Sequence, residues 1–308
     1  MFKLVFIINF VEKFNNMAVE KVFKISDEQI KEMYLSGSSL NDIAKVAQDT
    51  KGLMALRRKL HILGVDTNVS QKKYRYKISK ASKKYTLNEH IFDNIDTEEK
   101  AYWLGFLMAD GYNHESKSCV ALRLQVGDRE ILEKYKKFLE TDTPIYTFTR
   151  TTLVNKLIRQ YCELTICSPY FSEQLARLGC IQGKTYTLEF PNIPESLYSH
   201  FIRGYFDGDG CLSVRNRLSR RKSHGKSMSY QFTIVGRESV LLKIQDILVN
   251  NLNIPRISLR ERLNSPVKTI HYSGKNVVTK IMNYIYKDAT IYLERKYNLY
   301  LKYCISAE

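Results

Sequence analysis

The sequence predicts an α+β protein built from two tandem copies of one unit and preceded by a small all-helical segment. Two observations support the repeats: an apolar stretch ending in Asp-Gly occurs twice, and the same order of helical and strand-like patterns follows each copy. The third observation is a set of three short patterns with helix-capping residues before the first copy. With 308 residues, 44% of them hydrophobic, the chain is long enough for two or three domains.

The two copies align without gaps in two blocks. YWLGFLMADG at residues 102–111 aligns with FIRGYFDGDG at residues 201–210, so that an internal glycine and the final Asp-Gly coincide. GDREILEKYKKFL from Gly127 aligns in the same way with GRESVLLKIQDIL from Gly236. Two matching blocks in the same order indicate an internal duplication.

Each copy is expected to run helix, strand pair, helix, strand pair, helix, over residues 91–197 and 198–308. The strands expected from alternation and β-branched content are Val120–Val126, Pro144–Phe148, Tyr161–Cys167, Tyr230–Val235, Arg256–Leu259 and Val267–Tyr272. We expect each sheet to be mixed and to carry helices on one side only, which leaves its other face free.

Residues 26–66, after an N-terminal extension of residues 1–25, predict a helix-turn-helix-like domain. The expected helices are Asp27–Leu35, capped by Ser26, then Leu40–Ala47 and Lys51–Leu63. Arg57 and Arg58 would give the third helix a basic face for phosphates, opposite the leucines that pack inward. A three-helix cap with a solvated basic face is the alternative.

Charge favours a polyanionic partner, above all nucleic acid. Lys and Arg total 48 against 32 acidic residues, giving a formal net charge of +16 and a pI near 9.4. The predicted linker at residues 67–90 contains Lys72, Lys73 and Arg75 within a stretch of seven basic residues, three tyrosines and no acid. Such a segment is expected to lie along DNA and to contact its phosphate backbone. A basic but merely soluble protein, with a solvated tether, is the alternative.

The six cysteines show no Cys-x-x-Cys pair, so the sequence indicates neither a zinc site nor a disulfide scaffold. A reducing cytoplasm, in a phage, bacterial or organellar host, fits best. The apolar start of the chain is far shorter than the roughly 20 residues that span a bilayer, so no membrane association is expected.

The two Asp-Gly stretches read as paired helix ends. Glycines inside both apolar helices would let their backbones approach closely, and this would bring Asp110 and Asp209 together at two helix C-termini. Helix C-termini carry partial negative charge, so a hard divalent cation, Mg²⁺, is expected between the carboxylates. Gly111 and Gly210 would supply carbonyl ligands and the left-handed conformation that stops a helix.

These motifs resemble the LAGLIDADG motif of the dodecapeptide homing endonucleases, in the single-chain form with two motifs. The matching nonapeptides are WLGFLMADG at residues 103–111 and IRGYFDGDG at residues 202–210. The resemblance covers residues 91–308. One departure is the sixth motif position, acidic in many relatives, which holds Asp207 in the second copy but Met108 in the first.

The resemblance implies a monomer that cuts double-stranded DNA across the minor groove, one strand per aspartate, and leaves short 3′ overhangs. It implies two or three Mg²⁺ ions shared between Asp110 and Asp209. It also implies a lysine near the attacking water in each half. Lys184 in Gly-Lys-Thr matches that position well, and Lys296 in Leu-Glu-Arg-Lys-Tyr is the candidate in the second half although its spacing differs. Either could instead be an ordinary surface lysine.

The free sheet faces are expected to read DNA bases. Arg123 and Gln125 in the first copy and Gln231 in the second alternate suitably along strands, although the register that decides their face stays open. The loop between two strands of the second copy is expected to contact phosphates or a groove through Arg215, Arg217, Arg220, Arg221 and Lys222.

The leading hypothesis is therefore a site-specific DNA endonuclease. Two alternatives stay open: a DNA-binding regulator that does not cut, and an RNA maturase that assists intron splicing. Asp110→Asn would abolish cutting under the first hypothesis only.

Overall fold

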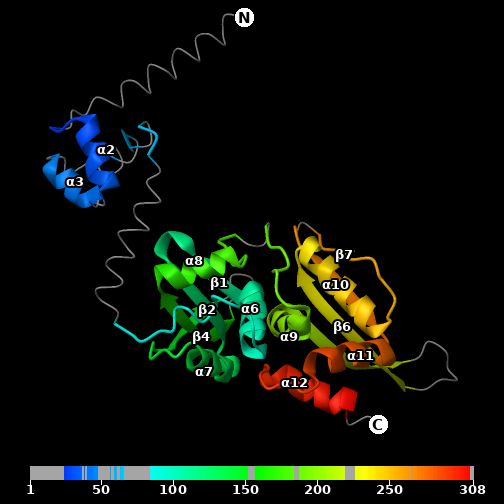
Figure 1. Cartoon of the computed structure of the whole chain (residues 1–308). Helices are drawn as coiled ribbons and strands as arrows, with labels where there is room; N and C mark the ends of the chain where they lie inside the picture. Colours follow the sequence, from blue (N-terminus) through cyan, green and yellow to red (C-terminus); the bar gives the residue numbers. More distant parts are fainter. Residues whose placement is uncertain are drawn as a thin grey trace, which may run out of the picture. The chain divides into compact units, whose positions relative to one another are not determined.

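The computed structural model (Figure 1) describes residues 24–36, 38, 40–47, 56, 59–60, 63–65, 84–151, 157–183, 187–218, 226–263 and 265–305. The chain divides into two compact units, residues 1–83 and 84–308. No helix among the described residues has both the length and the apolar character that crossing a membrane requires.

The N-terminal unit contains α2 (Asp27–Leu35) and α3 (Leu40–Val46). Ser26 caps α2 as predicted, in a capping box in which Ser26 and Gln29 bond to each other's backbone N–H. A small separate core is formed by buried side chains of both helices and of the segment after them, which are Ile30, Tyr34, Leu40, Ile43, Leu56, Leu60 and Val65. Most of the predicted third helix, with Arg57 and Arg58, lies outside the described residues, as do Lys72, Lys73 and Arg75.

The second unit contains the two copies predicted from sequence. The first copy consists of α6 (Glu98–Asp110), β1 (Gly111–His114), β2 (Cys119–Gln125), α7 (Arg129–Phe138), β3 (Tyr146–Thr151), β4 (Ile158–Cys167) and α8 (Pro169–Arg177). The second consists of α9 (Tyr198–Asp209), β5 (Gly210–Leu218), β6 (Lys226–Gly236), α10 (Glu238–Leu252), β7 (Arg260–Glu261), β8 (Lys268–Ser273), α11 (Lys275–Tyr286) and α12 (Glu294–Tyr300), with a π turn at Leu301–Ile305. The fold class is α+β, as predicted.

The two sheets have the same topology, β1-β2-β4-β3 and β5-β6-β8-β7. Every strand pairing in them is antiparallel, so the expectation of mixed sheets was wrong. Both strand pairs of a copy are hairpins, and the intervening helix returns the chain so that the second hairpin runs antiparallel to the first. The strand predicted at Arg256–Leu259 is instead a two-residue strand at Arg260–Glu261.

Helices cover one face of each sheet, as Figure 1 shows for α7 and α8 on the first and for α10 and α11 on the second. The register left open by the sequence is therefore settled. Leu122 and Leu124 point into the core, whereas Arg123 and Gln125 lie on the open face. The same alternation places Gln231 on the open face of the second sheet.

The two copies differ by a three-residue offset between strand and helix. Leu122, which pairs with Gly111, lies five residues before Gly127, whereas Ile234, which pairs with Gly210, lies two residues before Gly236. A 3₁₀ turn, Val126–Asp128, lies between β2 and α7, whereas Arg237 alone separates β6 from α10. Equivalent positions in β2 and β6 are therefore identified by their strand partners in β1 and β5. On this basis Leu122 corresponds to Ile234.

One disulfide, Cys119–Cys167, joins β2 to β4. The spacing of the cysteines gave no sign of it, because the two residues become neighbours only through the strand register. Cys162, Cys180, Cys211 and Cys304 are free.

Candidate active site at two helix ends

Helices α6 and α9 lie side by side between the two sheets (Figure 1). A Cβ atom added to Gly105 would overlap the carbonyl oxygen of Phe201 and lie 2.9 Å from the backbone nitrogen of Tyr205. A Cβ atom on Gly204 would overlap the carbonyl oxygen of Tyr102 and lie 3.0 Å from the nitrogen of Phe106. Glycine is therefore required at both positions for this helix contact, as the sequence predicted.

This contact brings the ends of the two helices together. Asp110 and Asp209 are the last residues of α6 and α9, and both side chains are exposed. A Cβ atom on Gly208 would lie 3.5 Å from the carboxyl carbon of Asp110. The Asp110 carboxyl group thus lies beside the backbone of α9, one residue before Asp209.

Gly111 and Gly210 end the helices in a conformation that the sequence analysis did not expect. Their φ angles are −70° and −99°, so both are extended and neither is left-handed. Glycine is needed here for space, because a Cβ atom would meet the carbonyl oxygen of Leu107 or Phe206 at 2.6 Å. Each glycine begins a strand, so the chain turns from helix to sheet directly at the aspartate.

Lys296 from α12 is 4% exposed and lies at the end of α9. Its ammonium group donates hydrogen bonds to the carbonyl oxygens of Phe206 (2.6 Å), Asp207 (2.8 Å) and Gly210 (2.6 Å). A cation at this position complements the partial negative charge of the helix C-terminus. Burial lowers the pKa of Lys296 to about 8, against the opposing electrostatic effects of Asp207, Asp110 and Cys211. The three hydrogen bonds need the protonated form, because a neutral amine has only two N–H groups.

Asp207 is buried beneath this end and joins the two copies. Its carboxylate accepts hydrogen bonds from the hydroxyl groups of Tyr102 (2.9 Å) and Tyr286 and from the backbone N–H of Leu293 (2.8 Å). Burial raises the pKa of Asp207, and the charge of Lys296 opposes that rise. Tyr102 belongs to α6, so this carboxylate links α9 to the opposite copy.

Neither this network nor the ion pair near it was predicted from the sequence. Arg203 is 1% exposed and donates to Glu98 at 2.6 Å and to the carbonyl oxygens of Ile285 and Ile291, both at 2.9 Å. The sequence signals were two charged residues within the same helix, Arg203 and Asp207, and they do not identify the partners.

The first copy can be compared with the second at two positions, those of Lys296 and Asp207. Lys184, the predicted counterpart of Lys296, lies outside the described residues. In place of Asp207 the first copy has Met108, which is buried and whose methyl group lies close to Gly179.

Within the described part of the chain, no three His, Cys, Asp or Glu side chains are grouped closely enough to bind a metal by themselves. The two exposed carboxylates and the carbonyl groups beside them are hard oxygen donors, which suit Mg²⁺ if substrate or water oxygens complete its coordination. One lone pair of the Gly210 oxygen is already used by Lys296.

The open sheet faces contain several of the predicted DNA contacts. Arg123, Gln125 and Arg215 are exposed, and Gln231 is partly exposed. The structure does not describe the side chain of Arg217. Arg220, Arg221 and Lys222 lie outside the described residues.

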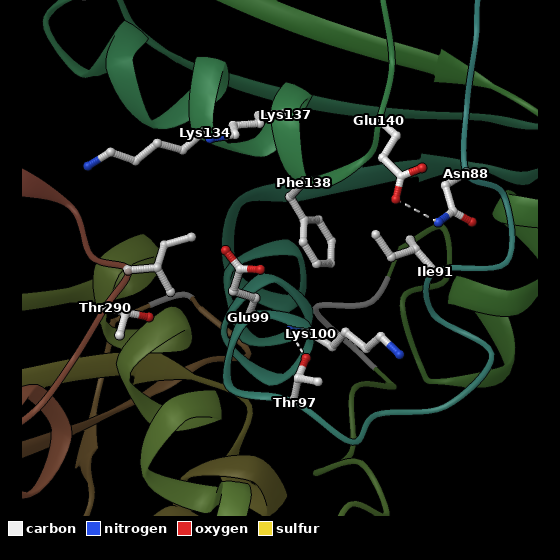
Figure 2. A pocket seen from close by; sticks show the side chains of 11 residues that line it. Asn88, Ile91, Thr97, Glu99, Lys100, Lys134, Lys137, Phe138, Glu140 and Thr290 are labelled. Carbon is white, nitrogen blue, oxygen red and sulfur yellow. Dashed lines mark hydrogen bonds between the residues drawn. The ribbon is translucent and has the colours of Figure 1, made fainter.

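A cavity of about 620 Å³ lies elsewhere, at the opposite end of α6 (Figure 2). It is lined by Thr97 and Lys100 from the start of α6, by Phe138 from α7 and by Thr290 from the second copy. A 13-residue helix is roughly 20 Å long. The cavity is therefore distinct from the paired helix ends.

Comparison with known proteins finds a sequence match to one family in the second copy. Residues 202–307 match the model of the family described as LAGLIDADG endonuclease. The chain is 27% identical over 227 residues to the reverse gyrase of Methanocaldococcus jannaschii; the match covers 72% of the chain but only 12% of that protein. A solved structure of the I-LtrWI LAGLIDADG homing endonuclease bound to target DNA is similar, with a TM-score of 0.45 and 14% identity over 68% of this chain and 91% of that one. The I-AabMI LAGLIDADG meganuclease bound to uncleaved DNA has a TM-score of 0.43 and 16% identity, covering 64% and 86% of the two chains.

The family match begins within α9 and extends through the second sheet, α11 and α12, so it includes Asp209, Gly210 and Lys296. The first copy has the same sheet topology and the same Asp-Gly helix end. The second copy is therefore similar in sequence to the LAGLIDADG endonuclease family.

Proposed function

We propose that this protein is a metal-dependent endonuclease that recognises one DNA site and hydrolyses one phosphodiester bond in each strand. The observation that carries the proposal is the convergence of two exposed carboxylates, Asp110 and Asp209, at paired helix ends between two sheets with open faces. A duplex lying on both open faces would pass the two carboxylates at its centre.

Asp110 and Asp209, with the carbonyl groups of Gly111 and Gly210, would hold two or three Mg²⁺ ions. Bound Mg²⁺ would lower the pKa of a water molecule and neutralise charge on the scissile phosphate and on the leaving 3′ oxygen. The chain itself fixes the geometry, since the glycine contacts of α6 and α9 set the spacing of the two carboxylates.

Lys296 would keep the second carboxylate in position. Its three hydrogen bonds tie α12 to the end of α9, and its charge lies near that of Asp110. In the first half we assign Lys184 a place near the attacking water, on its match to the family motif.

The open faces would bind the major groove on both sides of the cut. Arg123, Gln125 and Gln231 have the exposure that base contacts need. Arg215, and the loop with Arg217, Arg220, Arg221 and Lys222, would contact phosphates. The basic linker with Lys72, Lys73 and Arg75, and the helix with Arg57 and Arg58, would add affinity outside the cut site.

The test is cleavage of a plasmid library with a randomised insert in the presence of Mg²⁺. We expect the wild-type chain to produce linear plasmid whose ends define one site. Asp110→Asn with Asp209→Asn should abolish cleavage and retain duplex binding. Asp288→Asn, at an exposed turn of the same unit, controls for loss of one negative charge.

Two outcomes would contradict the proposal. Salt-sensitive duplex binding without cleavage by the wild-type chain would favour a DNA-binding regulator. Preferential binding of a structured intron RNA over duplex DNA would favour a maturase.

A further inference from the structure

The open face of the first sheet contains a cluster of cationic, acidic and aromatic side chains. Arg123 on β2 lies opposite Glu163 on β4 in the strand register. Nε of Arg123 donates to Oε2 of Glu163 at 2.6 Å, and Nη2 lies 2.5 Å from the same oxygen. The guanidinium group of Arg123 also lies 5.1 Å from the centre of the Phe148 ring, which stacks with Tyr161.

These contacts fix the orientation of the guanidinium group. Glu163 is itself held, because its other carboxylate oxygen accepts a hydrogen bond from Thr165 at 3.0 Å. An arginine that is both ion-paired and stacked has little conformational entropy left to lose on binding. The side chain nevertheless stays 39% exposed, which a purely structural ion pair does not require.

The bonds to Glu163 use two of the five N–H groups of the guanidinium. The remaining three are on Nη1 and Nη2, at the end of the side chain. Two parallel N–H groups at that end match the O6 and N7 acceptors of guanine in the major groove. A carboxylate beside them repels phosphate, so the pair suits a base edge better than the DNA backbone.

We propose that Arg123 is a specificity-determining residue that reads one guanine in the half-site bound by the first sheet, and that Glu163 positions it. This inference rests on the proposed function in one respect, that the open sheet face binds duplex DNA. Arg123 follows Leu122, the strand partner of Gly111, so the guanine would lie near the paired helix ends.

The second copy has no equivalent pair. The positions that correspond through the strand register are Val235 and Thr269, which pair with each other in the second sheet. Direct guanine recognition of this kind is therefore expected in one half-site only.

Arg150 provides a matched control. It lies on the same sheet face, 5.4 Å from the same Phe148 ring, and is exposed. Its interactions in the described part of the chain do not include an ion pair to Glu163, so it suits a phosphate contact.

The experiment selects bound sequences from a randomised duplex pool, using the full chain with Asp110→Asn and Asp209→Asn so that binding is read without cleavage. We expect one guanine to be enriched strongly in one half-site. Arg123→Ala should weaken binding to that sequence by about 5- to 150-fold and remove the preference at that base pair only. Arg123→Lys should not restore the preference, because lysine lacks the bidentate geometry. Glu163→Gln should loosen the preference at the same base pair.

Arg150→Ala should instead weaken binding to all sequences alike and reduce the salt dependence by about one ion. The inference is overturned if Arg123→Ala behaves in this uniform way, or if the position that it relaxes does not prefer guanine. Enrichment of the guanine without any cleavage by the wild-type chain would support the inference and refute the nuclease. Cleavage of a site with no such guanine would support the nuclease and refute the role of Arg123. Failure to bind any duplex would refute both proposals.

Discussion

Lys296 illustrates how one buried residue can be subject to opposing demands. Burial favours the neutral amine and lowers its pKa from 10.5 to about 8, whereas the three carbonyl groups around it require the ammonium form. At neutral pH the ammonium form prevails, and its hydrogen bonds hold the end of α9 beside Asp209. The residue thus positions the helix end at a cost in stability.

A pH dependence of stability follows from this shift. Between pH 8 and 10.5 the unfolded chain keeps the Lys296 proton and the folded chain releases it, so the contribution of Lys296 to the free energy of unfolding rises with pH in this window, by up to about 3 kcal/mol. That stability is lost as the pH falls through 8. Lys296→Met should remove the rise, and the measurement is urea unfolding of both proteins from pH 7 to 10.5. Parallel pH profiles for the two proteins would contradict the assignment.

Tyr102 tests the buried carboxylate that joins the copies. Tyr102→Phe removes one of the three donors to Asp207 and leaves the ring in place, so we expect a loss of about 1–3 kcal/mol in stability. Tyr112→Phe, at a side chain that is 49% exposed, should change stability by less than about 0.5 kcal/mol. Thermal unfolding of the three proteins compares them, and equal losses in the two variants would show that the hydrogen bond to Asp207 contributes little.

At the scale of elements, the fold depends on the close contact of α6 and α9. Gly105→Ala or Gly204→Ala would place a methyl group onto backbone atoms of the facing helix, which no rotamer change relieves. We expect each to cost about 3 kcal/mol or more, or to prevent folding. Gly127→Ala is the control, because no atom lies within 4 Å of its added Cβ and its φ is not positive. Chemical denaturation should separate the variants clearly, and a near-wild-type Gly105→Ala would contradict the packing.

The same helix pair shows which features a sequence can reveal. Its glycines, its Asp-Gly ends and the repeat were visible because each is a local pattern that occurs twice. Asp207, Tyr286 and Leu293 are brought together only by the tertiary fold, and no spacing in the sequence encodes that contact. For the same reason the Cys119–Cys167 bond and the antiparallel sheets were missed, since both depend on how β2 and β4 meet.

The glycines at the helix ends are a second example of a feature that the sequence revealed only in part. The sequence indicated that Gly111 and Gly210 stop their helices, and they do. The expected left-handed conformation was wrong, because each residue passes directly into a strand and its small size, not its φ angle, is what the site needs. Composition alone cannot separate these two uses of glycine.

At the scale of the whole molecule, the unit of residues 84–308 is symmetric in topology and asymmetric in chemistry. The two sheets share one strand order, yet Arg123 and Glu163 in the first correspond to Val235 and Thr269 in the second. A duplex bound across both faces would therefore meet different groups in its two halves. We infer that the target sequence is not palindromic.

The division of the chain into two units leads to a final prediction. Residues 84–308 hold both Asp-Gly helix ends, both sheets and a core that does not include the N-terminal cluster. Because that core is complete, a chain of residues 84–308 should fold and unfold cooperatively. We expect it to cut the same DNA site as the full chain, since the carboxylates and both open faces are retained.

Affinity should respond differently from cleavage. The truncated chain lacks Arg57, Arg58, Lys72, Lys73 and Arg75, for which we propose phosphate contacts, so its binding should be weaker and less dependent on salt. The measurement is the Kd for the cleaved duplex at several salt concentrations for both chains, together with mapping of the cut ends. Equal salt slopes would show that residues 1–83 do not contact DNA phosphates, whereas a changed cut site would show that they contribute to the choice of sequence.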